Sequence, residues 1–285
     1  MSFETNKDVL DWYERQPRTL TPEFINSIPW HQVNDHPLDE KFIPVLLYMR
    51  DVETLTDMYH RQMLRTPTGK DPYINKFMER WGVEEITHGE VINRFLNEIG
   101  FHTDKNWQTQ VRKAVTNYYH ASTYITTMIC NIFGRKFSAT HMTTGAIHEM
   151  EAAQGYRRLM TLANHPVLTY IVEGIIREEA AHGSFYRNIA LLELKRDKAA
   201  QKIARYLVEK FWVPVGQGSL LKSRTEYMVT TLFGDDEGLS LLDTTVTQRL
   251  QALPGFANIT TINDTMERIV NNHSEKMNAA VPAVA

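Results

Sequence analysis

Hydrophobic residues recur at spacings of three and four along most of the chain, which is the pattern of amphipathic helices. Over about residues 39–66, for example, the hydrophobic positions include Phe42, Val45, Leu46, Met49, Val52, Leu55 and Met58. Alternation with a period of two, which is typical of strands, is scarce, and the Asn-Gly and Asp-Gly dipeptides of tight hairpins are absent from the sequence. The pattern therefore predicts an all-α fold.

Glycine, proline and capping residues divide this pattern into elements. Long helices are predicted over about 39–66, 72–99, 103–133, 138–163 and 166–194, and shorter ones over about 197–212, 219–232, 238–251 and 261–275. Long helices joined by short breaks are typical of a helical bundle. We expect one domain over 1–285, with the bundle at about 39–195, additional C-terminal helices at about 197–275 and a flexible tail at 276–285.

One short motif occurs twice, each time inside a predicted helix. Glu84-Glu85-Ile86-Thr87-His88-Gly89 returns as Glu178-Glu179-Ala180-Ala181-His182-Gly183. Residues three apart lie on one face of a helix, so Glu85 projects beside His88, and Glu179 beside His182. A carboxylate and an imidazole in this arrangement can hold one metal ion. Glu-x-x-His from each of two helices, with one Glu from each of two others, is the ligand pattern of di-iron carboxylate bundles.

That pattern requires an inward-facing carboxylate on the helix before each motif. The helix before the second motif offers Glu149 and Glu151 in a mostly apolar setting, where an unpartnered carboxylate is costly. The helix before the first motif offers Glu53 on the same face as Leu46 and Met49, with Asp51 and Asp57 as alternatives. All four required helices therefore carry a candidate ligand.

The residue types narrow the choice of metal. Four carboxylates carry four negative charges, which balance two Fe(II) ions. Hard oxygen ligands and imidazole suit iron or manganese, and the lack of cysteine among the candidates argues against an iron–sulfur cluster or structural zinc. Glu84 and Glu178 project away from the predicted site. From there they can hold a neighbouring helix or orient a histidine.

Composition sets wider bounds on function. The chain has 285 residues and a net charge of −3, so no strong overall field draws it to nucleic acid or to an anionic membrane. Cys130 is the only cysteine, which excludes an intrachain disulfide. The N-terminus lacks the pattern of a secretory signal, and no apolar stretch reaches the length of a membrane span. We expect a cytoplasmic protein that does not insert into membranes.

The two motifs with their flanks resemble those of a known family. Trp81, Glu84, Glu85, His88 and Gly89 match the pattern W-x-x-E-E-x-x-H-G, and the stretch from Ile171 to Tyr186 is similar to the second motif of the same proteins. These are the soluble acyl-carrier-protein desaturases, the type-2 fatty acid desaturases of plastids and actinobacteria. The resemblance covers about residues 42–192 and implies a ferritin-like four-helix di-iron bundle.

The resemblance also implies which residues bind metal and what the protein does. The ligands would be Glu53, Glu85, His88, Glu149, Glu179 and His182, holding two iron ions, or manganese at one or both positions. With O2 as co-substrate and electrons from a donor such as ferredoxin, the enzyme would desaturate a fatty acyl chain on acyl carrier protein. The family relationship also implies a homodimer.

Further features bear on an acyl substrate. The segment Tyr118–Phe133 presents small and apolar residues that either line an acyl channel or pack in the core. The segment 195–224 is rich in lysine and arginine and either faces solvent or docks an acidic carrier protein.

Some features leave other functions open. Ala152 stands where the plant enzymes have a threonine near the oxygen site. This departure favours another di-iron oxidase or oxygenase, such as an N-oxygenase or a hydroxylase, as the alternative. Iron storage and a purely structural helical role are further alternatives.

Overall fold

The computed structural model describes the backbone of residues 3–280 and the side chains of residues 3–273. The prediction of an all-α fold is confirmed, since no β-strand forms within residues 3–280. The elements in chain order are α1 (Asn6–Glu14), α2 (Pro22–Ser27), the 3-10 helix η1 (Trp30–Asp35), α3 (Phe42–Thr54), α4 (Thr56–Met63), α5 (Pro72–Glu98), α6 (Trp107–Lys113), α7 (Asn117–Phe133), the 3-10 turn η2 (Gly134–Lys136), α8 (Phe137–Ala163), α9 (Pro166–Arg196), α10 (Lys198–Phe211), α11 (Lys222–Phe233), α12 (Asp236–Leu242), the π-helical η3 (Asp243–Thr247), α13 (Gln248–Gln251) and α14 (Thr261–Ala280).

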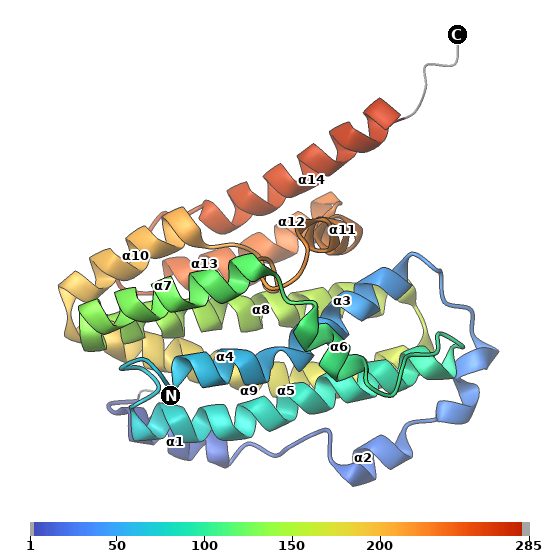
Figure 1. Cartoon of the computed structure of the whole chain (residues 1–285), viewed down its shortest axis with the longest axis horizontal. Coiled ribbons are helices and arrows are strands. Elements are labelled where there is room, and N and C mark those ends of the chain that lie inside the picture. The colour runs from blue at the N-terminus through green and yellow to red at the C-terminus, as the bar shows by residue number, and fades with distance from the viewer. Residues whose placement is uncertain (1–2, 281–285) are drawn as a thin grey trace.

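The two repeated motifs lie on α5 and α9, and the helix before each motif packs against it. Helix α8 runs along α9, α3 runs along α5, and α5 also contacts α9. In Figure 1 these helices form the centre of the molecule, with α1 and α2 on one side and α10 to α14 on the other. The sequence thus brings all four ligand-bearing helices into one packed unit.

Two long helices that the pattern predicts are each divided in the structure. The predicted helix 39–66 is α3 followed by α4, with the break at Leu55, whose N–H bonds Val52 O in a tight turn (3.0 Å). Thr54 and Thr56 flank the break, and β-branched residues favour helix weakly. The predicted helix 103–133 is α6 followed by α7, because the side chain of Thr116 caps a new helix by accepting from Tyr119 N.

The two ends of the chain also differ from the prediction. Helices α1 and α2 are short and precede the bundle, and no element was predicted there. Helix α1 begins with a capping box in which Thr5 and Asp8 exchange hydrogen bonds. At the other end, α14 extends to Ala280, beyond the expected limit of 275, and the rest of the predicted tail lies outside the described residues. No helix in the described part of the chain has both the length and the apolar character to cross a membrane.

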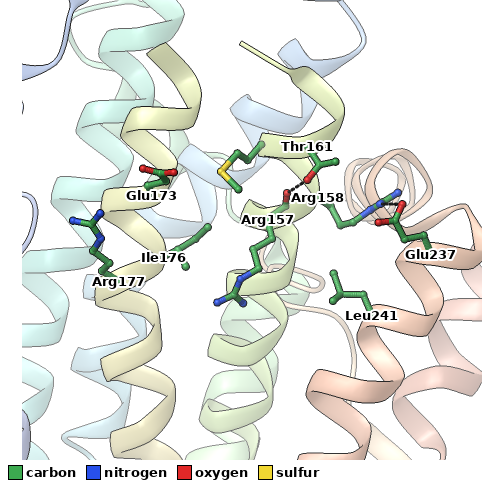
Figure 2. Close-up of a pocket in the computed structure, with 9 residues that line it drawn as sticks. Arg157, Arg158, Thr161, Glu173, Ile176, Arg177, Glu237 and Leu241 are labelled. Atoms are coloured by element: carbon green, nitrogen blue, oxygen red, sulfur yellow. Dashed lines mark hydrogen bonds and ion pairs between the residues drawn. The ribbon is translucent and has the colours of Figure 1, made fainter. Parts of the chain in front are cut away.

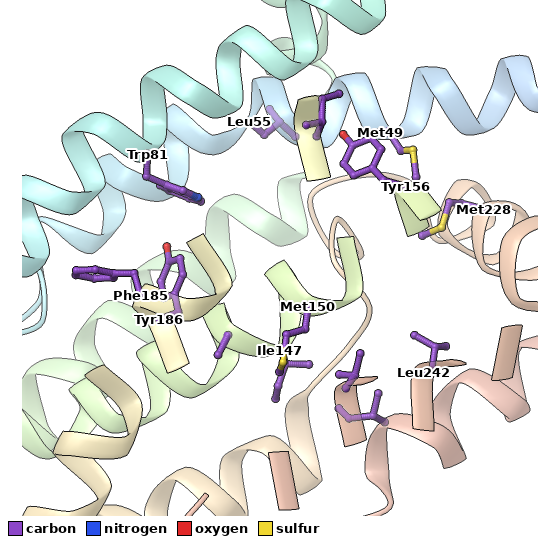
Figure 3. Packing of buried hydrophobic residues seen from close by; sticks show 14 of the residues in the cluster. Met49, Leu55, Trp81, Ile147, Met150, Tyr156, Phe185, Tyr186, Met228 and Leu242 are labelled. Carbon is purple, nitrogen blue, oxygen red and sulfur yellow. The ribbon is translucent and has the colours of Figure 1, made fainter. Parts of the chain in front are cut away.

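Aromatic side chains fill the space between α5 and α9. The rings of Phe77 and Phe185 stack with centroids 3.7 Å apart, and Trp81 meets Tyr186 edge-on at 5.9 Å. Figure 3 shows Trp81, Phe185 and Tyr186 gathered between the helices, with Tyr156 further along the core. This packing is rigid, since buried aromatic rings make many simultaneous contacts. It fixes the axial positions of the two motif helices.

The glycine that ends each motif lies where a neighbouring helix comes close. A Cβ on Gly89 would lie 3.1 Å from Thr54 Oγ1, 3.2 Å from Arg50 O and 3.4 Å from the Cβ of Glu53. A Cβ on Gly183 would lie 3.4 Å from the Cβ of Glu149. Gly89 therefore allows a close approach of α3, and each of the two glycines faces the candidate carboxylate of the helix before its motif.

The two glycines predict different responses to alanine. Gly89→Ala places a methyl group against the backbone of α3 and is expected to lower the free energy of unfolding by about 1–3 kcal/mol. Gly183→Ala makes only an ordinary contact and improves helix propensity, by up to about 1 kcal/mol. Urea unfolding of both variants and the wild type measures the difference. Equal stability of the two variants would contradict this account of the close approach.

Candidate metal centre

Six side chains from four helices meet in the interior. Their ligand atoms form two groups, within each of which all atoms lie within 4.8 Å of one another. One group is Glu53, Glu85, His88 and Glu179, and the other is Glu85, Glu149, Glu179 and His182. All six side chains are buried, and they are the six residues that the resemblance implies as ligands. We call them the Glu/His cluster.

The two groups share two carboxylates. Glu85 and Glu179 belong to both, whereas Glu53 and His88 belong to one group, and Glu149 and His182 to the other. This division provides two neighbouring positions for a cation, each with two private ligands and two shared ones. The residues of the cluster therefore fit a dinuclear site better than a single ion.

Several ligand atoms in the cluster have no hydrogen-bond partner. His88 Nδ1 lies 3.2 Å from Glu179 Oε1, and His182 Nδ1 lies 2.9 Å from Glu85 Oε1, but neither pair meets hydrogen-bond geometry. Both carboxylate oxygens of Glu179 are also buried without a partner. Buried polar atoms are normally satisfied, so such a concentration indicates a group that would bind them all.

The opposite nitrogen of each histidine is held by a glutamate of the other motif. His88 Nε2 lies 2.9 Å from Glu178 Oε2, and His182 Nε2 lies 2.8 Å from Glu84 Oε2. These two contacts cross between α5 and α9. They leave both Nδ1 atoms facing the centre, as expected for an imidazole whose far nitrogen donates to a carboxylate. The predicted orienting role of Glu84 and Glu178 agrees with this geometry.

The N-terminal segment supports these outer glutamates, and sequence reasoning missed it. Tyr13 donates its hydroxyl to Glu84 Oε2 (2.6 Å), and Arg80 Nε lies 2.8 Å from Glu84 Oε1. The backbone N–H groups of Thr19 and Leu20 donate to Glu178 Oε1, at 2.6 and 3.0 Å. No local sequence pattern predicts such contacts, because they join residues as much as 159 positions apart.

Two aromatic residues bind the carboxylates directly. Tyr156 donates its hydroxyl to Glu53 Oε1, and Trp81 Nε1 donates to Glu149 Oε1 at 3.1 Å. Trp81 is part of the first motif, but Tyr156 was not singled out from the sequence. Its position seven residues after Glu149, on the same face of α8, was the available signal.

The carboxyl groups of the cluster differ in their pKa shifts. Burial and the neighbouring carboxylates raise the pKa of Glu85 and Glu149 well above the usual value. Burial also raises the pKa of Glu179, but His88 and His182 outweigh it and lower that pKa. Burial likewise raises the pKa of Glu84, but hydrogen bonds from His182, Tyr13 and Arg80 lower that pKa to about 2. Burial lowers the pKa of His88, yet Glu178 and Glu179 raise it to about 10. Glu85 and Glu149 therefore hold protons unless a cation replaces them.

The alternative ligands lie elsewhere. Asp51 Oδ1 pairs with Arg50 (2.6 Å) and Asp51 Oδ2 with Arg224 (2.7 Å). Asp57 pairs with Arg61 at 2.6 Å and with Arg112 at 3.3 Å. Glu151 belongs to neither ligand group. Among the candidates left open by the sequence, Glu53 and Glu149 are thus the ones that reach the cluster.

A large cavity opens beside the cluster. Its volume is about 920 Å³, and its lining includes Glu53, Glu85, Glu149 and Glu179. One wall comes from α7, including Ala121, Ser122, Ile125 and Ile129. Of the two roles left open for Tyr118–Phe133, the structure shows that this segment lines a cavity. That the cavity binds an acyl chain remains a prediction.

A second hollow, of about 520 Å³, lies between α8, α9 and α12. Figure 2 shows its charged lining, in which Arg158 reaches Glu237 while Arg157, Glu173 and Arg177 lie on α8 and α9. None of its lining residues belongs to the Glu/His cluster. The cavity beside the cluster is thus the one in which a substrate would meet the metal ligands.

The raised pKa values predict how metal and pH act together on stability. In metal-free protein, Glu85 and Glu149 contribute stability that is present below about pH 4.5 and lost as the pH rises towards neutrality. A divalent cation replaces these protons, so the increase in Tm caused by Mn(II) should be larger at pH 8 than at pH 5.5. At about 100 times the Kd, Mn(II) should raise the free energy of unfolding by about 2.7 kcal/mol.

Thermal unfolding with and without MnCl2 across this pH range measures the effect. The control is the double variant Glu85→Gln/Glu149→Gln, in which the Mn(II) effect should shrink and lose its pH dependence. A Tm increase that is the same at every pH, or the same in the variant, would contradict the prediction.

No protein-family model matches this chain, and no curated protein matches it either. The interpretation of the Glu/His cluster therefore depends on its own chemistry, namely two overlapping ligand groups, unpartnered buried atoms and the outer carboxylates that orient both imidazoles.

Proposed function

We propose that the chain is a ferritin-like, O2-dependent di-iron oxidoreductase. The observation that carries this proposal is the Glu/His cluster, whose two ligand groups share Glu85 and Glu179. Four carboxylates balance the charge of two divalent ions, and two neutral imidazoles complete the ligand set. In the absence of cations, these buried carboxyls reduce their mutual repulsion only by keeping protons, as the raised pKa values of Glu85 and Glu149 indicate.

The donor set fits iron or manganese. It consists of carboxylate oxygens and imidazole nitrogens, which suit these ions better than copper(I). The one cysteine of the chain, Cys130, lies near His141 (Sγ to Nε2, 3.4 Å) and outside both ligand groups. When bound, two iron ions supply the reduction of O2 that makes removal of hydrogen from an unactivated C–H group feasible.

Other residues of the chain orient the ligand side chains, and the fold keeps these side chains away from bulk water. Glu84 and Glu178 fix the ring orientation of the histidines, and Tyr156 and Trp81 hold the carboxylates of Glu53 and Glu149. Burial of all six ligands excludes bulk water from the reacting region. The cavity beside the cluster has room for part of an organic substrate on this buried side of the bundle, which supports the proposal.

The favoured substrate is a fatty acyl chain carried on acyl carrier protein. The cavity volume of about 920 Å³ is sufficient for such a chain. Residues such as Met49, Leu55 and Ile129 give the cavity an apolar lining. In the balanced reaction, –CH2–CH2– with O2, two electrons and two protons gives –CH=CH– and two waters. The electrons would come from a carrier such as ferredoxin, and the family resemblance favours a homodimer.

The basic segment 195–224 bears on the carrier. Arg196, Arg205 and Arg224 pair with Glu193, Glu209 and Asp51 of the same chain. These arginines are partly neutralised within the molecule. Lys198, Lys202 and Lys210 are the remaining cations of this segment on α10 and would face an acidic carrier protein.

One observation favours a hydroxylase or N-oxygenase instead. Ala152 provides no hydroxyl on the cavity wall beside Glu149, where the plant desaturases carry a threonine. Incubation with a ferredoxin system, O2 and either acyl carrier protein substrates or free amphiphiles distinguishes the two. A desaturated product is two hydrogens lighter than its substrate, whereas a hydroxylated product is one oxygen heavier.

The decisive test of the proposal is iron content. After anaerobic loading with Fe(II) and desalting, the wild type should retain about two irons per chain. His88→Ala/His182→Ala should lose most of this iron, because each position loses its only nitrogen ligand. His141→Ala, which removes a half-buried histidine outside the cluster, serves as the matched control and should retain the iron. Equal iron in wild type and double variant would remove the basis of the proposal.

A further inference from the structure

Helix α8 lines the cavity with one broad face. His148, Ala152 and Gly155 lie near the middle of this face, while Glu149 and Glu151 lie at its two edges. Two residues correspond to about 200° around a helix, so the two carboxylates project from opposite flanks of α8. Glu149 enters the Glu/His cluster, and Glu151 lines the cavity on the other flank.

Glu151 is a buried carboxyl with one oxygen unused. Its side chain is 1% exposed. Oε2 accepts a single long hydrogen bond, from the backbone N–H of Val215 at 3.4 Å, and Oε1 has no hydrogen-bond partner. A buried carboxyl oxygen without a donor is costly, and native structures seldom keep one without a role.

The neighbouring polar groups are already engaged. Tyr48 donates its hydroxyl to Val215 O and lies 3.0 Å from Thr225 Oγ1, and His148 Nε2 lies 3.2 Å from Val213 O. Both contacts hold the loop between α10 and α11 in place. Neither side chain donates to Glu151, so Oε1 has no donor among the described residues, while Glu151 itself lines the cavity.

We propose that Glu151 accepts a hydrogen bond from a hydroxyl or amino group on the apolar chain that binds in this cavity. The ligand is thus an amphiphile that carries an O–H or N–H donor within its buried part, rather than a plain hydrocarbon chain. Since the two carboxylates flank one helix, this donor lies on the order of 10 Å from the Glu/His cluster. Glu151 is then a specificity-determining residue of the substrate site.

This inference deepens the proposed function. It rests on that function only where the bound amphiphile is called a substrate. Binding to the cavity can be measured without turnover. Octan-1-ol and octylamine carry a donor, and octyl methyl ether has an alkyl chain of the same length but no donor. Isothermal titration of the full-length protein with each ligand gives the ratio of affinities that reports on the donor.

The wild type should bind octan-1-ol or octylamine about tenfold more tightly than the ether, which corresponds to one hydrogen bond to a carboxyl group. Glu151→Met removes the acceptor with little change in volume and should bring that ratio close to one. Thr144→Val, which removes a hydroxyl from the same face of α8, is the matched control and should keep the ratio. Whichever donor loses more affinity in Glu151→Met identifies the group that Glu151 accepts.

Equal affinity of the wild type for all three ligands would overturn the inference, even if Glu151→Met failed to fold. An unchanged ratio in a folded Glu151→Met would also overturn it. The outcome is separate from that of iron loading. A donor preference without bound iron would retain the cavity site and reject the di-iron function, and iron binding without the preference would do the reverse.

Discussion

Four buried carboxyl groups and two imidazoles meet between α3, α5, α8 and α9. Such a cluster is unfavourable in a low-dielectric interior unless protons or cations reduce the repulsion. The packing of the surrounding helices holds these carboxyl groups and imidazoles together despite this repulsion. Gly89 lets α3 come close to α5, and the aromatic stack of Phe77 and Phe185 packs α5 against α9.

The hydrogen bonds between the histidines and the first glutamates of the motifs link α5 and α9 in both directions. Each motif helix uses its first glutamate to orient the histidine of the other, so α5 and α9 specify each other's ring positions. The N-terminal segment then fixes these glutamates through Tyr13 and the N–H groups of Thr19 and Leu20. The short helix α1 and the segment after it are therefore part of the site, although they lie outside the bundle.

The sequence predicted the parts of the site that depend on local geometry. The spacing of Glu85 and His88 follows from the helix repeat, and the fold class follows from the hydrophobic period. The choice between Glu53 and Asp51 could not be predicted from local geometry, because Asp51 is neutralised by Arg224, which lies 173 positions away. Tyr13 was missed for the same reason. The break at Leu55 was missed because a continuous hydrophobic pattern runs through it.

The acidic residues near the site fall into three environments, and the environment decides what each can do. Asp51 and Asp57 have arginine partners and are accounted for by structure. The inner glutamates have one another and the imidazoles, an arrangement that could hold a pair of cations. Glu151 has only the distant N–H of Val215 and faces the cavity. Since α8 carries Glu149 and Glu151 on opposite flanks, a single helix sets the distance between the Glu/His cluster and the unpartnered carboxyl that lines the cavity.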